Sequence, residues 1–193
     1  MRALILGHSF VKGLERRDVR KQFLVNQRSV DLTYKAFPGA TFRTFLDEPT
    51  LIDTAIECDP DIVVIILGGN DITGNVTNTE IRANIKEFFE LLKQKVKTGV
   101  KILATQVEAR TYITPNQRNC PGQEEYRLRR NAINKYLQKL KLKDYLVNIA
   151  GPGRLDNPSY FRGDGVHLNS AGYHILYVYI KHSIEYALTH REI

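Results

Sequence analysis

The sequence has little of what marks membrane, secreted or metal-binding proteins. Its only two cysteines, Cys58 and Cys120, are too few for a disulfide framework and lack metal-ligand spacing. The longest strongly apolar run, Ile62 to Leu67, is far shorter than a membrane span. The start is no secretory signal, because the apolar run from Ala3 to Leu6 is too short. We therefore expect a cytoplasmic protein with two free thiols, and a single Cys58–Cys120 bridge stays open.

The chain also lacks low-complexity stretches, internal repeats and linkers. Of its 193 residues 42% are hydrophobic and 25% are charged, which is ordinary for a globular protein and excludes disorder. The length suits one core, so we expect residues 1–193 to form a single domain. Lys and Arg number 28 against 21 Asp and Glu, for a net charge of +7. This excess favours anionic partners and carries no information about chemistry.

Apolar runs alternate with helical patterns along the whole chain. The runs that predict strands are Ala3–Leu6, Leu32–Ala36, Ile62–Leu67, Val100–Val107 and Tyr145–Ile149. Helices are expected after Ser9, over Thr41–Glu57 in two pieces divided at Pro49, over Asn78–Lys97 with a Thr77/Glu80 capping box, over Glu124–Leu142, and from Ser170 onward. Continuous apolar strands predict a five-stranded parallel sheet covered on both faces. With right-handed crossovers, the pattern gives a three-layer α/β/α sandwich.

Polar segments follow three of these strands, and a fourth lies in the last loop. They are Gly7-His8-Ser9-Phe10, Phe37-Pro38-Gly39-Ala40, Gly68-Gly69-Asn70-Asp71 and Asp164-Gly165-Val166-His167. Sites in such folds form beyond the carboxyl ends of the strands. We therefore expect all four segments to meet at one edge of the sheet.

Together these segments contain what acyl transfer requires. Ser9 is a candidate nucleophile, His167 its base, and Asp164 the group that orients the base. The backbone N–H groups of Ser9 and Gly39 and the side-chain amide of Asn70 can form an oxyanion hole. Each piece alone has a commoner explanation, since a serine at a helix start is usually only a cap and Gly-Gly-Asn-Asp is usually a turn. Their combination at one edge of the sheet favours the catalytic interpretation.

The same residues resemble those of the SGNH hydrolases, also called GDSL-like esterases and lipases. Ser9, Gly39, Asn70 and the Asp164-x-x-His167 pair match the four sequence blocks of that family in order. The resemblance implies a flavodoxin-like topology, an ester substrate that could be a lipid, and an acyl-enzyme intermediate without metal or cofactor. One departure is His8, where the family usually has Asp. Within the family, the chain looks most like the small intracellular forms, including platelet-activating-factor acetylhydrolases, and like esterase domains of some animal retrotransposon proteins.

Other functions fit the sequence less well. The first turn matches neither a dinucleotide fingerprint nor a P-loop, and Ser9 lacks the G-x-S-x-G pattern of α/β-hydrolases. His174, His182 and His190 recur every eight residues, about 12 Å apart on a helix, which is too far to share a metal. A non-catalytic module on an esterase scaffold, binding anionic lipid or nucleic acid, remains the alternative.

The positive charge gathers in two clusters. They are Lys12, Arg16, Arg17, Arg20 and Lys21, and Arg127, Arg129, Arg130, Lys135, Lys139, Lys141 and Lys143. Solvated helix faces are the simplest explanation, and an anionic membrane surface is the functional one. Nucleic acid is less favoured, because the basic helices lack interleaved aromatic residues. The oligomeric state is left open.

Overall fold

The computed structural model describes the chain except residues 19–20, 112, 114–120, 141–148, 151–154 and 190–193. Its strands are β1 (Arg2–Gly7), β2 (Gln22–Val25), β3 (Arg28–Ala36), β4 (Ile62–Ile66), β5 (Lys101–Thr105) and β6 (Ile149–Ala150). Its helices are α1 (Ser9–Glu15), α2 (Phe42–Asp47), α3 (Thr50–Ile56), α4 (Asn78–Lys95), α5 (Gln123–Lys139) and α6 (Ser170–Thr189), with a 3-10 turn over Pro158–Tyr160.

The sheet has the order β2-β3-β1-β4-β5-β6. The pairs β3–β1, β1–β4, β4–β5 and β5–β6 are parallel. These five strands confirm the predicted parallel sheet, and their order is the flavodoxin-like one. The predicted last strand lies mostly on 141–148, outside the described residues, and β6 is described only over Ile149–Ala150.

One strand was not predicted. The short β2 pairs antiparallel with β3, and Val25 faces Arg28 across the turn between them. The turn residues Asn26 and Gln27 both have positive φ, at 48° and 64°, as a two-residue type I′ hairpin requires. The parallel sheet therefore gains an antiparallel edge strand.

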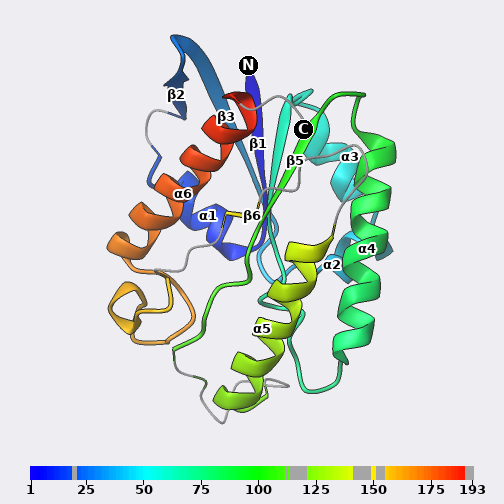
Figure 1. The fold of residues 1–193 in the computed structure, drawn as a ribbon, viewed down its shortest axis with the longest axis vertical. Coiled ribbons are helices and arrows are strands. Elements are labelled where there is room, and N and C mark those ends of the chain that lie inside the picture. Colours follow the sequence, from blue (N-terminus) through cyan, green and yellow to red (C-terminus); the bar gives the residue numbers. More distant parts are fainter. Residues whose placement is uncertain (19–20, 112, 114–120, 141–148, 151–154, 190–193) are drawn as a thin grey trace.

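Helices cover both faces of the sheet (Figure 1), and alternate strand residues supply the two cores. Leu4 and Leu6 of β1 pack into the cluster that contains buried residues of α2, α3, α4 and α5. Ala3 and Ile5 point the other way, into the cluster with α1 and α6. This is the predicted three-layer sandwich.

The predicted helices are present, but α4 ends at Lys95 and not at Lys97, and α5 runs over Gln123–Lys139 and not over Glu124–Leu142. Thr77 accepts a hydrogen bond from the Glu80 backbone, while the Glu80 side chain returns one to the Thr77 backbone, forming a capping box at α4. Helices α2 and α3 are separate, with Pro49 at the start of α3. Within the described part of the chain, no helix combines the length and apolar character that a membrane span needs.

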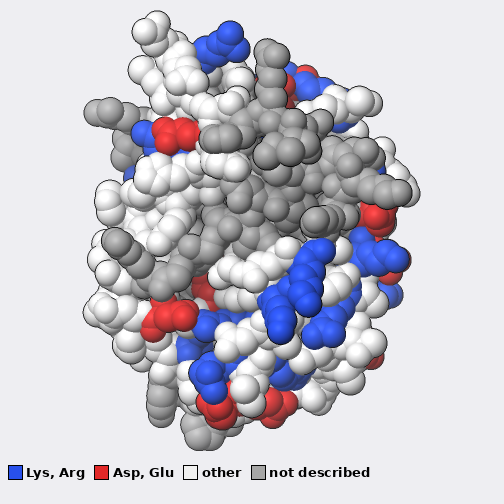
Figure 2. Space-filling view, in the orientation of Figure 1, with Lys and Arg blue, Asp and Glu red and all other residues white. Residues whose placement is uncertain are grey.

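Helices α1 and α5, which carry Lys12 of the first basic cluster and Arg127 to Lys139 of the second, belong to different layers. Arg20, Lys141 and Lys143 of these clusters lie outside the described residues. Figure 2 shows Lys and Arg gathered over the α5 side, with acidic residues at its lower end. Arg129 was expected on the helix surface, but it is only 8% exposed. Its guanidinium donates to the Asn78 side chain and to the carbonyl of Thr73. Arg129 therefore joins α5 to the segment before α4, and its charge is not presented to a partner.

Candidate active site

The first two polar segments are brought together where β1 ends. The amide of Phe37 donates to Gly7 O at 2.8 Å, and the amide of His8 donates to Ile66 O at 3.2 Å. A Cβ on Gly7 would lie 2.1 Å from Ile66 O, so only glycine lets the two strands approach there. These contacts place the segments after β1, β3 and β4 at one edge of the sheet, as the sequence predicts.

Ser9 is the first residue of α1, and His8 is its N-cap. The His8 ring is 4% exposed, and its Nδ1 accepts from the Phe10 amide at 3.4 Å. Because Nδ1 acts as acceptor, the neutral ring carries its proton on Nε2. Burial, followed by the positive charges of Arg110 and His167, lowers the pKa of His8 to about 4. His8 is therefore a neutral cap beneath Ser9.

The last loop joins Asp164 and His167. Asp164 Oδ1 accepts the backbone amides of Val166 and His167, each at 2.9 Å. Asp164 Oδ2 lies 2.8 Å from His167 Nδ1. Burial alone would raise the pKa of Asp164, but the hydrogen bonds from His167 and Val166 outweigh it and hold that pKa below its usual value. An ionised Asp164 keeps the proton of His167 on Nδ1 and leaves Nε2 as an acceptor.

Ser9 and the loop of His167 border the same small cavity. Ser9, Asn70 and Val166 are among its lining residues, and its volume is about 20 Å³. Within the described residues, Ser9 Oγ makes no hydrogen bond to His167. Such a bond is often long or misaligned without substrate.

The third segment faces this cavity from β4. The Asn70 side-chain amide donates to Ala40 O at 3.2 Å. The neighbouring Asp71 accepts the Phe42 amide at 3.0 Å, which ties the third segment to the second. Gly39, in the second segment, has φ of +82°, and nothing lies within 4 Å of the position that a Cβ would take. Its backbone therefore has the open approach that an oxyanion-hole residue needs.

Three residues with polar side chains in this cavity were not identified from the sequence. Glu108, Arg110 and Tyr126 line it together with His8 and Ser9. Glu108 is 4% exposed, and its Oε1 has no hydrogen-bond partner among the described residues. Burial raises the pKa of Glu108 to about 8, although hydrogen bonding and the charge of Arg130 oppose the rise. The signal that could have identified Glu108 and Arg110 is their position just after β5.

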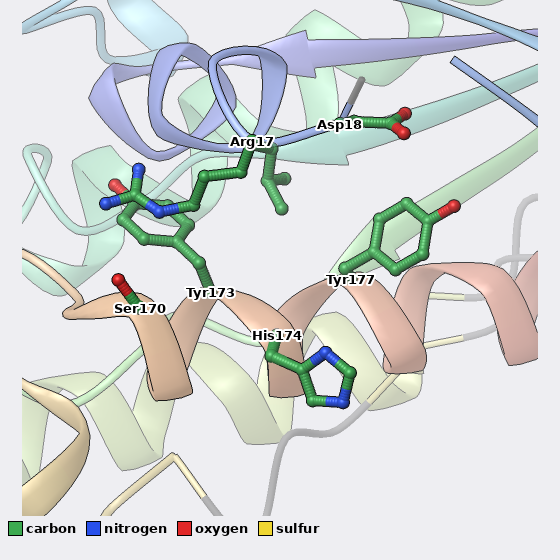
Figure 3. A pocket seen from close by; sticks show the side chains of 7 residues that line it. Arg17, Asp18, Ser170, Tyr173, His174 and Tyr177 are labelled. Carbon is green, nitrogen blue, oxygen red and sulfur yellow. The ribbon is translucent and has the colours of Figure 1, made fainter. Parts of the chain in front are cut away.

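A larger cleft lies between α1 and α6, away from Ser9. It measures about 430 Å³ and is lined by Arg17, Tyr173 and Tyr177 among others. Figure 3 shows Arg17, in the turn after α1, reaching across the Tyr173 ring of α6, 4.3 Å from the ring centroid. None of the predicted catalytic residues lines this cleft. We place the candidate active site at the smaller cavity, because the predicted nucleophile, Ser9, lines it.

The described residues contain no cluster of three or more side chains that could hold a metal ion. His174 and His182 are exposed on α6, as expected, whereas His190 lies outside the described residues. Cys58 is half-buried and has no disulfide partner among the described residues. Its possible partner Cys120 also lies outside the described residues, so the disulfide alternative is not tested.

Known structures share the fold over almost the whole chain. A GDSL-like lipase from Bacteroides thetaiotaomicron is 22% identical, with a TM-score of 0.70, covering 96% of this chain and 88% of its own. A carbohydrate esterase of family 3 from Talaromyces cellulolyticus is 16% identical, with a TM-score of 0.68 and coverages of 99% and 100%. An acetylxylan esterase from Geobacillus stearothermophilus is 16% identical, with a TM-score of 0.62 and coverages of 95% and 93%.

A search of curated proteins found no match. The model of the GDSL-like lipase/acylhydrolase family matches residues 5–175. This stretch includes Ser9, Gly39, Asn70, Asp164 and His167, and it confirms the resemblance seen in the sequence. The chain belongs to the GDSL-like lipase/acylhydrolase family and is a serine-type carboxylic ester hydrolase.

Proposed function

We propose that the chain hydrolyses short-chain carboxylic esters, with Ser9 as nucleophile, His167 as general base and Asp164 as the residue that orients the base. The observation that carries this proposal is the bond of 2.8 Å between His167 Nδ1 and Asp164 Oδ2, in a loop that borders the Ser9 cavity. All five proposed site residues lie within the stretch that matches the family model, and we treat the chain as one esterase domain.

The proposed reaction has two halves. Ser9 Oγ attacks the ester carbonyl carbon while its proton passes to His167 Nε2. The resulting oxyanion accepts hydrogen bonds from the amides of Ser9 and Gly39 and from the Asn70 side chain. Collapse breaks the bond to the alcohol, which leaves with the proton from His167. A water molecule then attacks the acyl-enzyme by the same route and releases the acid.

The size of the cavity supports a short acyl group. A volume of about 20 Å³ is roughly that needed for one water molecule. Among acyl groups, acetyl needs the least room, so it suits this narrow space best. Acetate esters are therefore the proposed substrates, ahead of long-chain lipid esters.

An acyl-length series tests the substrate proposal. We expect kcat/KM for 4-nitrophenyl esters to fall from acetate to butyrate to octanoate. Octanoate hydrolysis faster than acetate hydrolysis would overturn the short-chain proposal but would leave the assignment of Ser9 as nucleophile unaffected.

Labelling with a fluorophosphonate tests the nucleophile and separates an enzyme from a binding module. Ser9 Oγ should form a bond to phosphorus as fluoride leaves, and mass spectrometry should locate the adduct on the Ser9 peptide. Wild-type protein that takes up no label would favour the non-catalytic module, whereas a Ser9→Ala variant that takes up as much label as wild type would show that the reactive nucleophile is a residue other than Ser9.

Binding to an anionic membrane has less support from the structure than from the sequence. In the described part of the chain, α1 and α5, which carry residues of the two basic clusters, cover opposite faces of the sheet, so Lys12 and the basic residues of α5 do not share one flat surface. Arg127 is paired with Glu124, and Arg130 with Asp156. Salt-sensitive co-sedimentation with anionic but not neutral vesicles remains the test, beside an RNA shift assay.

A further inference from the structure

The side-chain amide of Asn70 contacts two groups, one of which can only accept hydrogen bonds and one of which can only donate them. Its Nδ2 lies 3.2 Å from Ala40 O, and its Oδ1 lies 3.4 Å from Nη2 of Arg110. A carbonyl oxygen only accepts hydrogen bonds, and a guanidinium only donates them. Both contacts therefore specify the same orientation of the amide, with Oδ1 toward Arg110.

Arg110 is itself fixed on two elements. Its Nη2 donates to Gly69 O at 2.9 Å, which holds the guanidinium against the segment after β4. The guanidinium carbon lies 4.9 Å from the centroid of the Tyr126 ring, a distance at which the cation and the ring attract each other. Tyr126 belongs to α5, is 1% exposed, and donates its hydroxyl to Glu108 O at 3.3 Å. Arg110 therefore stands on a buried, hydrogen-bonded ring.

We propose that Arg110 is a positioning residue of the oxyanion hole, which holds the Asn70 amide so that Nδ2 faces the developing negative charge. This inference rests on the proposed function. One Nδ2 proton is donated to Ala40 O, and the second is available to the oxyanion of the substrate. If the amide turned over, Oδ1 would replace Nδ2, and an acceptor would meet the oxyanion in place of a donor. Arg110 prevents this inversion by offering Oδ1 a charged donor.

A role through Asn70 makes a specific kinetic prediction. Arg110→Met removes the donors and the charge but keeps an unbranched apolar side chain beside Tyr126. It should lower kcat about 10- to 100-fold, somewhat less than the loss of an oxyanion donor, with little change in KM. Arg110→Lys keeps a charged donor without the planar fork, so it should recover part of kcat. Arg82→Met is the matched control. Arg82 is exposed on α4, and its guanidinium carbon also lies over a tyrosine ring, 5.8 Å from the centroid of Tyr136.

A double-mutant cycle is the decisive measurement. If Arg110 acts through Asn70, Arg110→Met should have almost no effect on kcat in an Asn70→Ala background. Effects that multiply in the double variant would overturn the proposal, because Arg110 would then act on the substrate directly or only support the fold. Unchanged kcat in Arg110→Met alone would also overturn it.

A second readout does not depend on turnover. Absence of any Ser9-dependent hydrolysis would refute the proposed function. Even then, the NMR signals of the Asn70 side-chain amide would show whether Arg110 holds that amide in place. These signals can be identified by their loss in Asn70→Ala. We expect the Nδ2 protons to exchange faster with water in Arg110→Met than in wild type or in Arg82→Met. Equal exchange rates in all three proteins would overturn the positioning role.

Discussion

His167 Nδ1 and Asp164 Oδ2 lie 2.8 Å apart, and the other oxygen of the same carboxylate holds two backbone amides of the loop. One carboxylate thus shapes the loop and sets the tautomer of the imidazole. These two tasks can be separated by substitution, because an amide oxygen can still accept from the backbone.

Asp164→Asn should therefore keep the conformation of the loop but no longer favour the His167 tautomer with its proton on Nδ1. We expect kcat for an acetate ester to fall by roughly 100- to 10,000-fold, since an amide no longer favours a proton on Nδ1. Thermal unfolding of the variant should stay close to wild type. An unchanged kcat would show that other groups orient His167.

Asn70→Ala should lower kcat with little change in KM. Removing one donor from an oxyanion hole typically costs about 100- to 1000-fold in kcat. Steady-state kinetics on 4-nitrophenyl acetate measures both constants. An effect confined to KM would instead make Asn70 a group that binds the ground state.

Glu108→Gln should stabilise the protein increasingly as the pH rises. Burial raises the pKa of Glu108 from 4.5 to about 8, so between these values the folded protein holds a proton that the unfolded chain has released. Stability from this group therefore falls as pH rises through that window. Glutamine resembles the protonated carboxyl and does not titrate. The gain in the free energy of unfolding should be near zero at pH 4.5 and reach on the order of a few kcal/mol at pH 8. A gain that is independent of pH would contradict the assigned titration.

His8→Asn should make the protein less sensitive to acid. The pKa of His8 is lowered from 6.5 to about 4, so between these values the folded protein binds fewer protons than the unfolded chain. Its contribution to stability is present above pH 6.5 and is lost as the pH falls toward 4, by about 3 kcal/mol in full. Asparagine can also cap α1 but does not titrate in this range. Urea unfolding of both proteins at pH 4.5 and 7 measures the difference, and equal pH dependence would contradict the account.

The fold followed from the sequence wherever apolar runs were continuous. The buried strand Ile62–Ile66 and the capped helix Asn78–Lys95 are set by local signals that the tertiary structure preserves. The hairpin strand Gln22–Val25 was missed because its turn is Asn26-Gln27, which lacks the usual glycine. Its alternation is also short, with Phe23 and Val25 buried between exposed neighbours.

Some residues of the candidate site could likewise be predicted from the sequence, and others could not. Ser9, Asn70, Asp164 and His167 carry side chains whose chemistry is recognisable in short motifs. Glu108 and Arg110 belong to no motif, and their importance comes from burial and from contacts with Gly69, Asn70 and Tyr126. Sequence spacing does not reveal such contacts, because they join segments tens of residues apart.

The central claim is that Ser9 and His167 act as one catalytic unit. The most direct test is 4-nitrophenyl acetate hydrolysis by wild type, Ser9→Ala, His167→Ala and the double variant at matched, folded concentrations. We predict that each single substitution lowers kcat by about 10,000-fold or more and that the double variant is little worse than either, as expected of residues that work together. Hydrolysis by Ser9→Ala at close to the wild-type rate would contradict the mechanism.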